Sequence, residues 1–328
     1  MYPFSITDII NRNSQPVDEY TILELFKYQA ERCAVYKKYI ELLGVKPEKV
    51  KTIGQIPFLP VEFFKTKKIY SSEIQPDAVF IGSGTSGSET GKHFVADVGI
   101  YRRSYVEGFD YFYGNSSSYA FLALLPSYLE RQGSSLITMA EGLIAESVKP
   151  YSGFFLYDHR SLFEALLELK AKSQKTILMG VSFALLDFAE NYSLDFPDLI
   201  VMETGGMKGR KTEIPRAELH SILKKAFGVP AVHSEYGMTE LLSQAYSRGD
   251  GLFFTPPWMR VIIRDMQNPL KLAENNRTGG INVIDSANVN SCSFIETQDL
   301  GKLTGDGSFE VLGRFDLSDI RGCNLMAV

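Results

Sequence analysis

Apolar residues recur at helical spacing from residue 18 to residue 43, with Ile22, Phe26 and Cys33 on one face. This pattern predicts one long amphipathic helix, which Gly44 would end. Cys33 lies on the apolar face and is expected to be a plain core residue, as buried free cysteines usually are.

Between residues 78 and 235 short apolar runs alternate with longer amphipathic ones. The short runs predict strands at residues 79–81, 119–125, 154–157, 176–179 and 199–202. The amphipathic runs predict helices at residues 161–172, 183–192 and 216–227. Alternation of this kind is typical of an α/β fold with a largely parallel sheet.

Beyond Gly249 the pattern changes to short β runs separated by Asn, Gly and Asp. These runs cover residues 260–264, 281–284, 293–296 and 309–312. They predict a smaller β subdomain, at about residues 250–312, that rests on the same core. With 328 residues in all, the chain can bury one large core or two modest ones.

Composition and charge exclude several classes of protein. The net charge of −5 comes with no Lys/Arg cluster, so nothing predicts a nucleic-acid interface. The first residues lack the pattern of a signal peptide, and the longest apolar stretch is too short to span a bilayer. Three widely spaced cysteines and four scattered histidines favour neither a disulfide framework nor a structural metal site. We therefore expect a cytoplasmic protein with reduced thiols.

The stretch FIGSGTSGSETGK, residues 80–92, is rich in glycine, serine and threonine and follows an apolar run. Its first three glycines match the dinucleotide fingerprint G-x-G-x-x-G, which needs a helix to open at the loop. Residues 93–96 instead have the pattern of a returning strand. A Walker A loop would need glycine in place of Ser86 and a hydroxyl residue in place of His93. No kinase catalytic-loop motif follows.

A flexible strand–loop–strand is the interpretation that remains. Glycines allow successive backbone N–H groups to turn toward an anion, and the hydroxyls of the loop add donors. These hydroxyls belong to Ser83, Thr85, Ser86 and Ser88. Lys92 adds a positive charge. The loop is therefore a candidate phosphate site, with a solvent-exposed Ser/Gly turn as the alternative.

Later motifs carry further candidate chemistry. In Tyr236-Gly-Met-Thr-Glu240, Thr239 could donate to a phosphate and Glu240 could hold Mg²⁺, ahead of a predicted helix. A plain helix start capped by Thr239 is the alternative. Asp299 could accept two ribose hydroxyls, and Arg314 lies in the segment VLGRFDLSDIRG.

In this order and spacing the motifs resemble those of the acyl-adenylate-forming superfamily, whose members attach carboxylic acids to AMP. That family has a Ser/Thr/Gly-rich phosphate loop ending in lysine, a Y-G-x-T-E motif, a ribose-binding aspartate and a G-R-x-D hinge. More narrowly, IPFLPVEFFKTKKI, EYGMTELLSQAY and GRFDLSDIRGCNLM look like segments of the acyl-protein synthetases of bacterial luminescence systems. The resemblance covers nearly the whole chain.

The resemblance implies an adenylate-forming α/β core over residues 1–312 and a hinge-like segment and tail over residues 313–328. Lys92, Thr239, Glu240 and Cys323 would be catalytic, with Glu240 also holding Mg²⁺. ATP would be bound by Ser83, Gly84, Thr85, Ser86, Gly87, Gly205, Gly206, Tyr236, Gly237, Asp299 and Arg314. Within this set, the two glycines after residue 204 would form the platform for adenine, and the tyrosine would pack on the other face of the base.

Two departures from the family pattern bear on these roles. The loop has two extra residues before Lys92. The superfamily's C-terminal domain, which brings a catalytic lysine, is expected to be absent, because the sequence ends twelve residues after Asp316.

The implied reaction is attack of a carboxylate on the α-phosphorus of ATP, which releases pyrophosphate, followed by transfer of the acyl group to a protein thiol. A long-chain fatty acid is the expected substrate, with its chain beside residues 178–189. Cys323 is the candidate acyl carrier, and a thiol of a partner reductase or carrier protein is the alternative.

Other classes stay open. The stretch GVSFA around Ser182 resembles a nucleophile elbow, with Asp198 and His220 or His233 in hydrolase order, which would make the protein a serine acyltransferase. The plainer interpretation is that Ser182 caps a helix. An aryl- or acyl-CoA ligase with a partner acceptor is a further alternative, as is a non-catalytic acyl- or nucleotide-binding subunit.

Overall fold

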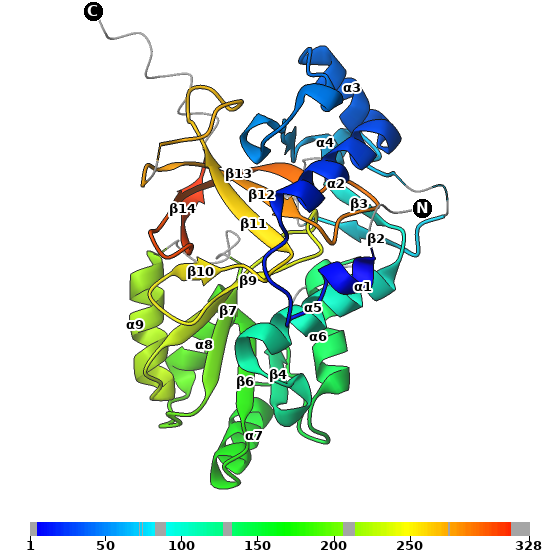
Figure 1. The fold of residues 1–328 in the computed structure, drawn as a ribbon. Helices are drawn as coiled ribbons and strands as arrows, with labels where there is room; N and C mark the ends of the chain where they lie inside the picture. Colours follow the sequence, from blue (N-terminus) through cyan, green and yellow to red (C-terminus); the bar gives the residue numbers. More distant parts are fainter. Residues whose placement is uncertain are drawn as a thin grey trace, which may run out of the picture.

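The computed structural model describes residues 5–71, 73, 75–82, 90–126, 133–205, 214–274 and 276–315. Its helices are α1 (Ile6–Ile9), α2 (Glu19–Arg32), α3 (Ala34–Leu42), α4 (Phe63–Thr66), α5 (Val98–Tyr113), α6 (Ser135–Glu146), α7 (His159–Ala171), α8 (Ser182–Asn191) and α9 (Arg216–Phe227). Its strands are β1 (Leu59–Pro60), β2 (Ala78–Ile81), β3 (Lys92–Val95), β4 (Ala120–Leu124), β5 (Gly153–Phe154), β6 (Thr176–Val181), β7 (Ile200–Thr204), β8 (Val232–Tyr236), β9 (Ala245–Ser247), β10 (Leu252–Phe254), β11 (Met259–Arg264), β12 (Gly279–Asp285), β13 (Phe294–Leu303) and β14 (Phe309–Arg314). Figure 1 shows the α/β region in green and the later strands in yellow to red.

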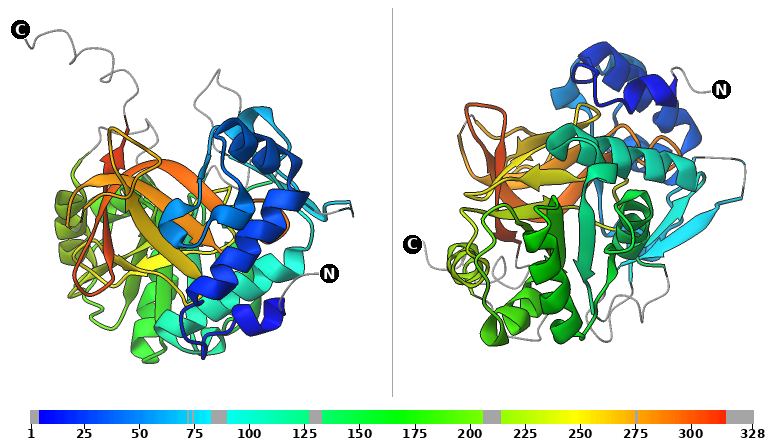
Figure 2. Two further views of the ribbon diagram at one scale, coloured as in Figure 1. Left: turned by 45° about the horizontal axis from the view of Figure 1, so that its top comes forward. Right: turned by 90° about the horizontal axis from the view of Figure 1, so that it is seen from below.

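The α/β region is a parallel sheet in the order β5–β4–β6–β7–β8, flanked by helices α6 to α9 (Figure 2). Side-chain caps start two of these helices: Asp158 accepts from the Ser161 N–H (3.0 Å), and Ser134 precedes α6 in the same way. The predicted helices and strands of this region form, except that the strand expected at residues 154–157 ends at Phe154. Leu156 adopts a left-handed conformation (φ 49°), which turns the chain toward α7 instead.

The strand expected at residues 79–81 belongs to a separate hairpin. β2 pairs antiparallel with β3, so the returning strand predicted after the glycine-rich loop is present. A strand therefore follows the loop where a dinucleotide fingerprint would need a helix, and the helix α5 begins only at Val98.

The single helix expected over residues 18–43 is two helices, α2 and α3. Cys33 separates them in an extended conformation (φ −83°, ψ 99°) and is itself fully buried, as predicted. The break allows the apolar faces of both helices to turn toward one core. The Tyr36 hydroxyl anchors the second helix by donating to the Pro57 carbonyl (2.6 Å).

The strands beyond residue 249 continue the parallel sheet. β8 pairs antiparallel with β9, and the order then runs through β10, β14, β13 and β12 to β11. The β runs predicted from the sequence are all present, and β13 extends further than expected, to Leu303. The predicted fold class, an α/β core with a mainly parallel sheet and a smaller β part, is confirmed.

A cluster of aromatic side chains joins the N-terminal helices to β13. The ring of Phe294 lies 5.9 Å from that of Phe26, 6.1 Å from that of Tyr36 and 6.0 Å from that of Phe58. Edge-on and offset ring pairs of this kind stabilise a core beyond the apolar area they bury.

We expect Phe294→Ala to lower the free energy of unfolding by about 3–5 kcal/mol, because it removes a fully buried ring and leaves a cavity. Urea denaturation followed by far-UV circular dichroism measures the loss. Phe254→Ala is the matched control: its ring is 40% exposed on β10, and its removal should cost about 1 kcal/mol or less. Equal losses in the two variants would contradict the inference that Phe294 holds the N-terminal helices against β13.

Candidate active site

The base of the glycine-rich hairpin lies against the turn that follows β8. The Gly82 N–H donates to the Gly91 carbonyl (2.9 Å), which closes the hairpin. A methyl group built on Gly91 would lie 2.5 Å from Glu240 Oε1, and one built on Gly82 would lie 3.8 Å from Thr239 Oγ1. Only glycine at position 91 allows the Glu240 carboxyl group to come this close to the loop.

His93 fastens the hairpin to this turn. Its Nδ1 lies 2.9 Å from the Thr239 carbonyl oxygen, and its Nε2 lies 3.0 Å from Ser291 Oγ. A carbonyl oxygen can only accept, so Nδ1 carries the proton and Nε2 accepts from the serine hydroxyl. Burial lowers the pKa of His93 to about 4, which keeps the ring neutral at physiological pH.

The helix expected after Glu240 does not form. Asn288 Nδ2 donates to the Glu240 carbonyl (2.7 Å), and Asp285 Oδ2 accepts from the Leu242 and Ser243 N–H groups (2.8 and 3.0 Å). These side chains satisfy backbone groups that a helix would otherwise pair. The chain passes into β9 instead, and the prediction was wrong because these partners lie far away in the sequence.

A second cluster lies at the start of the same turn. The Tyr236 hydroxyl donates to Asp299 Oδ2 (2.8 Å), and Arg314 Nε lies 3.3 Å from Asp299 Oδ1. Asp299 and Arg314 are directly opposite on β13 and β14, so the sheet fixes their spacing. Burial raises the pKa of Asp299, and the hydrogen bond from Tyr236 and the charge of Arg314 oppose this shift.

Glu240 links the two clusters electrostatically. Burial raises its pKa to about 7, although the positive charges of Arg314 and Lys65 lower it. Because Arg314 also pairs with Asp299, the loop base and the Asp299 cluster form one site. A carboxyl group whose pKa lies near neutrality beside specific charges is a mark of functional sites.

The two lysines near the hairpin differ in their relation to Glu240. Lys92 is exposed, and because side chains alternate along β3, it lies on the face opposite His93. Lys65, on the short helix α4, is the lysine whose charge reaches the Glu240 carboxyl group. Lys65 lies within the segment IPFLPVEFFKTKKI and His93 in the returning strand, but no sequence motif assigns either residue to the site; the packing of α4 against β3 brings them there.

Gly205 follows the last residue of β7 and lies beside Ser182. Gly205 has φ 67°, and its carbonyl accepts from Ser182 Oγ (2.6 Å), which also reaches Glu203 Oε2 (3.2 Å). His220 lies beside the Glu203 carboxyl group, and His233 is hydrogen-bonded to the Tyr113 hydroxyl. In the described part of the chain neither histidine forms a hydrogen bond with Ser182. The serine-acyltransferase alternative therefore lacks its base, and Ser182 simply begins α8.

The remaining predicted site residues have no described contact with the loop base or the Asp299 cluster. Those outside the described residues are Ser83, Gly84, Thr85, Ser86, Gly87, Gly206 and Cys323. Gly237 is described, and it is exposed next to Tyr236. The binding and catalytic roles assigned to all of these residues stay predictions.

In the ranges that the structure covers, no three His, Cys, Asp or Glu side chains gather to hold a metal ion. Mg²⁺ does not need such a cage, because it commonly binds one or two carboxylates and takes its other ligands from water and substrate phosphates. Glu240, with its carboxyl group against the base of the loop at Gly91, fits that donor set.

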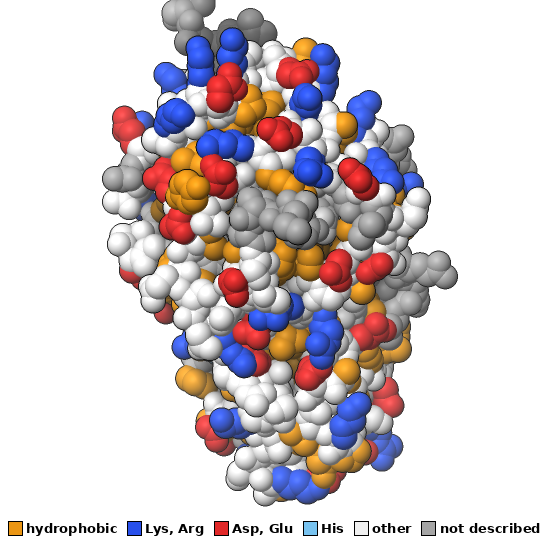
Figure 3. All heavy atoms as spheres, turned by 45° about the vertical axis from the view of Figure 1, so that its right-hand side comes forward, with side chains coloured by type: hydrophobic (Ala, Val, Ile, Leu, Met, Phe, Trp, Pro, Cys, Tyr) orange, Lys and Arg blue, Asp and Glu red, His pale blue; other side chains and the backbone are white. Residues whose placement is uncertain are grey.

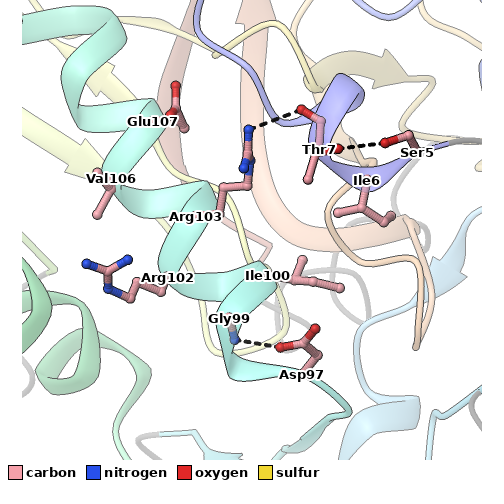
Figure 4. Close-up of a pocket in the computed structure, with 10 residues that line it drawn as sticks. All are labelled: Ser5, Ile6, Thr7, Asp97, Gly99, Ile100, Arg102, Arg103, Val106 and Glu107. Atoms are coloured by element: carbon pink, nitrogen blue, oxygen red, sulfur yellow. Dashed lines mark hydrogen bonds between the residues drawn. The ribbon is translucent and has the colours of Figure 1, made fainter.

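A surface hollow of about 680 Å³ lies elsewhere, between α1 and the first turns of α5 (Figure 4). Arg103 reaches across it and donates to the carbonyls of Ile10 (2.8 Å) and Thr7 (3.2 Å). Asp97 caps the Gly99 N–H (2.7 Å). These groups are already paired within the fold and none is a predicted site residue, so the hollow is not part of the site.

On the face shown in Figure 3, acidic and basic side chains are interspersed, and the coloured part of that face has no continuous basic patch. Among the helices that the structure describes, none is both long and apolar enough to cross a membrane.

No protein-family model and no curated protein matches the chain. Solved structures do match it. The ATP-bound MatB of Rhodopseudomonas palustris has 20% identity and a TM-score of 0.54, over 72% of this chain and 48% of MatB. A 2-hydroxyisobutyryl-CoA ligase in complex with R3-HIB-AMP has 14% identity and a TM-score of 0.68, over 93% of this chain and 70% of the ligase. The same ligase with 2-HIB-AMP and CoA has 15% identity and a TM-score of 0.67, over 91% of this chain and 68% of the ligase.

Over most of its length the chain has the fold of these solved structures. It spans about half the length of MatB. At these identities the likeness shows the fold, and the residues that act in this chain have to be argued from its own geometry.

The raised pKa of Glu240 makes stability depend on pH. A glutamate that titrates at about 7 when folded and near 4.5 when unfolded stabilises the folded state below pH 4.5, and this contribution is lost as the pH rises through 7. We therefore expect Glu240→Gln to gain stability relative to the wild type between pH 5 and pH 8, by on the order of 1–3 kcal/mol. Urea denaturation at both pH values measures the difference. Glu31→Gln, on an exposed position of α2, is the control, and an equal gain there would contradict the assignment.

Proposed function

We propose that this protein activates a carboxylic acid as an acyl-AMP and passes the acyl group to a thiol. The observation that carries the proposal is the meeting of the glycine-rich hairpin, Glu240 and the Asp299–Arg314 pair around one turn. A phosphate loop, a metal-binding carboxylate and an acceptor for ribose are the parts that nucleotide activation needs.

ATP would lie across this turn. Backbone N–H groups of the glycine-rich loop would hold its phosphates, since such groups form anion-binding nests. Asp299 would accept the ribose hydroxyls, with Arg314 and the Tyr236 hydroxyl fixing the orientation of its carboxylate. Gly205, which follows β7 and has no side chain, would let the base approach the backbone.

The acid and ATP are both anions, so charge neutralisation governs their approach. Mg²⁺ held by Glu240 would supply Lewis-acid stabilisation of the phosphates. Lys65 and Arg314 already act on the Glu240 carboxyl group, and their charges would lower the repulsion between the two substrates. Lys92, at the end of the loop, would contribute from the opposite face of the hairpin.

In the first step a carboxylate oxygen of the acid would bond to the α-phosphorus, and the bond from that phosphorus to the departing pyrophosphate would break. In the second, a thiolate would displace AMP from the mixed anhydride. The matched CoA ligase holds 2-HIB-AMP and CoA, which supports the adenylate route and makes CoA one candidate thiol. The resemblance to acyl-protein synthetases favours a long-chain fatty acid and a protein thiol.

ATP–pyrophosphate exchange tests the adenylation step. With Mg²⁺, ATP and labelled pyrophosphate, we expect exchange that depends on an added acid from a panel of fatty, hydroxylated and aryl acids. Asp299→Asn should lower kcat/KM for ATP by about 10–150-fold, because charge-assisted hydrogen bonds are worth ~1.5–3 kcal/mol.

Asp306→Asn, in the turn that joins β13 to β14, is the matched control and should exchange like the wild type. Absence of exchange with every acid would reject the enzyme and leave a non-catalytic binding subunit as the alternative. Exchange that is equally impaired in both aspartate variants would reject Asp299 as a ribose ligand.

The burial of the cysteines narrows the set of residues in this chain that could accept the acyl group. Of its three cysteines, Cys33 and Cys292 are fully buried, and burial raises the pKa of both thiols. The thiolate is the nucleophilic form, so these two are poor acceptors. Cys323 is the remaining thiol and the proposed acyl carrier.

Incubation with ATP and a radiolabelled acid that supports exchange should therefore label the protein as a thioester. Neutral hydroxylamine should release the label, and Cys323→Ser should abolish it while exchange persists. Labelling of Cys323→Ser at the wild-type level would place the acceptor at another residue of this chain, and no labelling of the wild type would move it to CoA or a partner protein.

A further inference from the structure

Glu235 precedes Tyr236 on β8 and points to the other face of the strand. Tyr236 lies on the face where it bonds Asp299, so alternation puts Glu235 on the opposite one. The antiparallel pairing of β8 with β9 places Tyr246 directly across from Glu235, on this same face. Glu235 and Tyr246 thus form a cross-strand pair next to the turn that follows β8.

Among the described residues the Glu235 carboxyl group has a neutral partner and no cation. Thr204 Oγ1 donates to its Oε2, and a methyl group built on Gly237 would lie 2.5 Å from its Oε1. Within the described residues no lysine, arginine or histidine forms an ion pair with it. Burial raises its pKa to about 7, and the nearby charge of Glu203 acts in the same direction.

The Tyr246 hydroxyl is unpaired. Its side chain is 1% exposed, and in the described part of the chain its oxygen has no hydrogen-bond partner. The ring is fixed against Phe112 and Tyr113 of α5, with centroids 5.2 and 5.6 Å away. Burial, and next the charge of Glu235, raise the pKa of Tyr246, so the two polar groups lie within electrostatic reach of each other.

Buried polar groups without partners destabilise a fold, and replacing them with apolar ones is often neutral or stabilising. Glu235 and Tyr246 lie across from each other on β8 and β9, and within the described residues the carboxyl group has no ion pair and the phenol has no hydrogen-bond partner. The pair therefore points to a ligand that satisfies both groups. The position of the pair fits the acid substrate. The Glu235 carboxyl group lies against Gly237 in the turn that carries Thr239 and Glu240, where the reacting carboxylate would be held.

We infer that the acid activated by this protein carries a hydroxyl or amino group a few bonds from its carboxylate, and that Glu235 and Tyr246 select it. The inference rests on the proposed acyl-adenylate function and specifies its substrate class. The substituent would donate its O–H or N–H to the Glu235 carboxyl group, and the Tyr246 hydroxyl would bond to the same substituent. An acyl chain without such a group would leave both protein groups unpaired.

Exchange rates with matched pairs of acids test this selection. The pairs are tetradecanoic against 2- and 3-hydroxytetradecanoic acid, 2-methylpropanoic against 2-hydroxy-2-methylpropanoic acid, and butanoic against 2-aminobutanoic acid. We expect wild-type kcat/KM to favour a substituted acid over its unsubstituted partner by about tenfold or more. Glu235→Leu should reduce that ratio to near one.

Tyr246→Phe separates selection from folding. Because it removes an unpaired buried hydroxyl, its denaturation midpoint should equal or exceed that of the wild type. Its preference for the substituted acid should nevertheless fall several-fold. Ser234→Ala is the control: its hydroxyl is also buried and unpaired, but it lies on the other face of β8, so the ratio should not change.

The outcomes distinguish a failure of the inferred substrate class from a failure of the proposed acyl-adenylate function. Exchange with unsubstituted acids at least as good as with substituted ones, or a preference that survives both Glu235→Leu and Tyr246→Phe, overturns the substrate class and leaves adenylation intact. Absence of exchange with every acid removes the proposed function and this inference with it.

Discussion

The hydrogen bond from His93 Nδ1 to the Thr239 carbonyl joins two parts of the molecule that the main sheet does not hold together. The glycine-rich loop belongs to the separate β2–β3 hairpin, whereas Thr239 follows β8 in the large sheet. In the neutral ring Nδ1 donates to the Thr239 carbonyl and Nε2 accepts from the Ser291 hydroxyl. Burial of the imidazole favours that neutral form. The position of β3 beside the turn after β8 is therefore held by a single buried imidazole that bonds both sides.

The turn that carries Glu240 is held by side chains instead of a helix. Asp285 is fully buried, and burial raises its pKa, but the hydrogen bonds that it accepts from Ser243 and from neighbouring backbone groups oppose this shift. Ser243 Oγ also accepts from Trp258 Nε1 (3.1 Å) and lies 3.0 Å from Ser104 Oγ on α5. The turn is thus tied to β12, to the chain before β11 and to α5, which makes it a rigid element on which reacting groups can be placed.

Much of the architecture can be predicted from the sequence because short-range patterns of apolar and polar residues determine it. Alternating apolar runs predict β4, β6, β7 and the helices α7, α8 and α9, and the same local signals predict the strand that returns after the glycine-rich loop, while no pattern predicts α5 or α6. The strand expected at residues 154–157 ends early, at Phe154. Two further failures have non-local causes. The long N-terminal helix breaks at Cys33 so that α2 and α3 can both pack on the core. The helix expected after Glu240 is replaced because Asp285 and Asn288, distant in sequence, capture its backbone groups.

Prediction of the site residues shows the same division between local and non-local information. Motif order identified Tyr236, Glu240, Asp299 and Arg314, and the structure brings these residues into contact or electrostatic reach of one another. Lys65 could not be found in this way, because its charge reaches Glu240 only through the packing of α4 beside the hairpin. A short sequence motif can identify the groups that a site needs, whereas the charged residues that support those groups can lie on any element that packs nearby.

Two glutamates five residues apart show how one strand and its turn can create different chemistry. Burial raises the pKa of both to about 7, but the charges of Arg314 and Lys65 act on Glu240, while the partner of Glu235 among the described residues is the hydroxyl of Thr204. A cation that binds Glu240 would favour its ionised form and release a proton, whereas Glu235, with no cation beside it in the described part of the chain, favours the neutral form. The site can therefore carry less negative charge than its acidic side chains suggest. In the proposed reaction ATP and a carboxylate have to approach each other, and each ionised glutamate would add to the repulsion that the surrounding cations have to overcome.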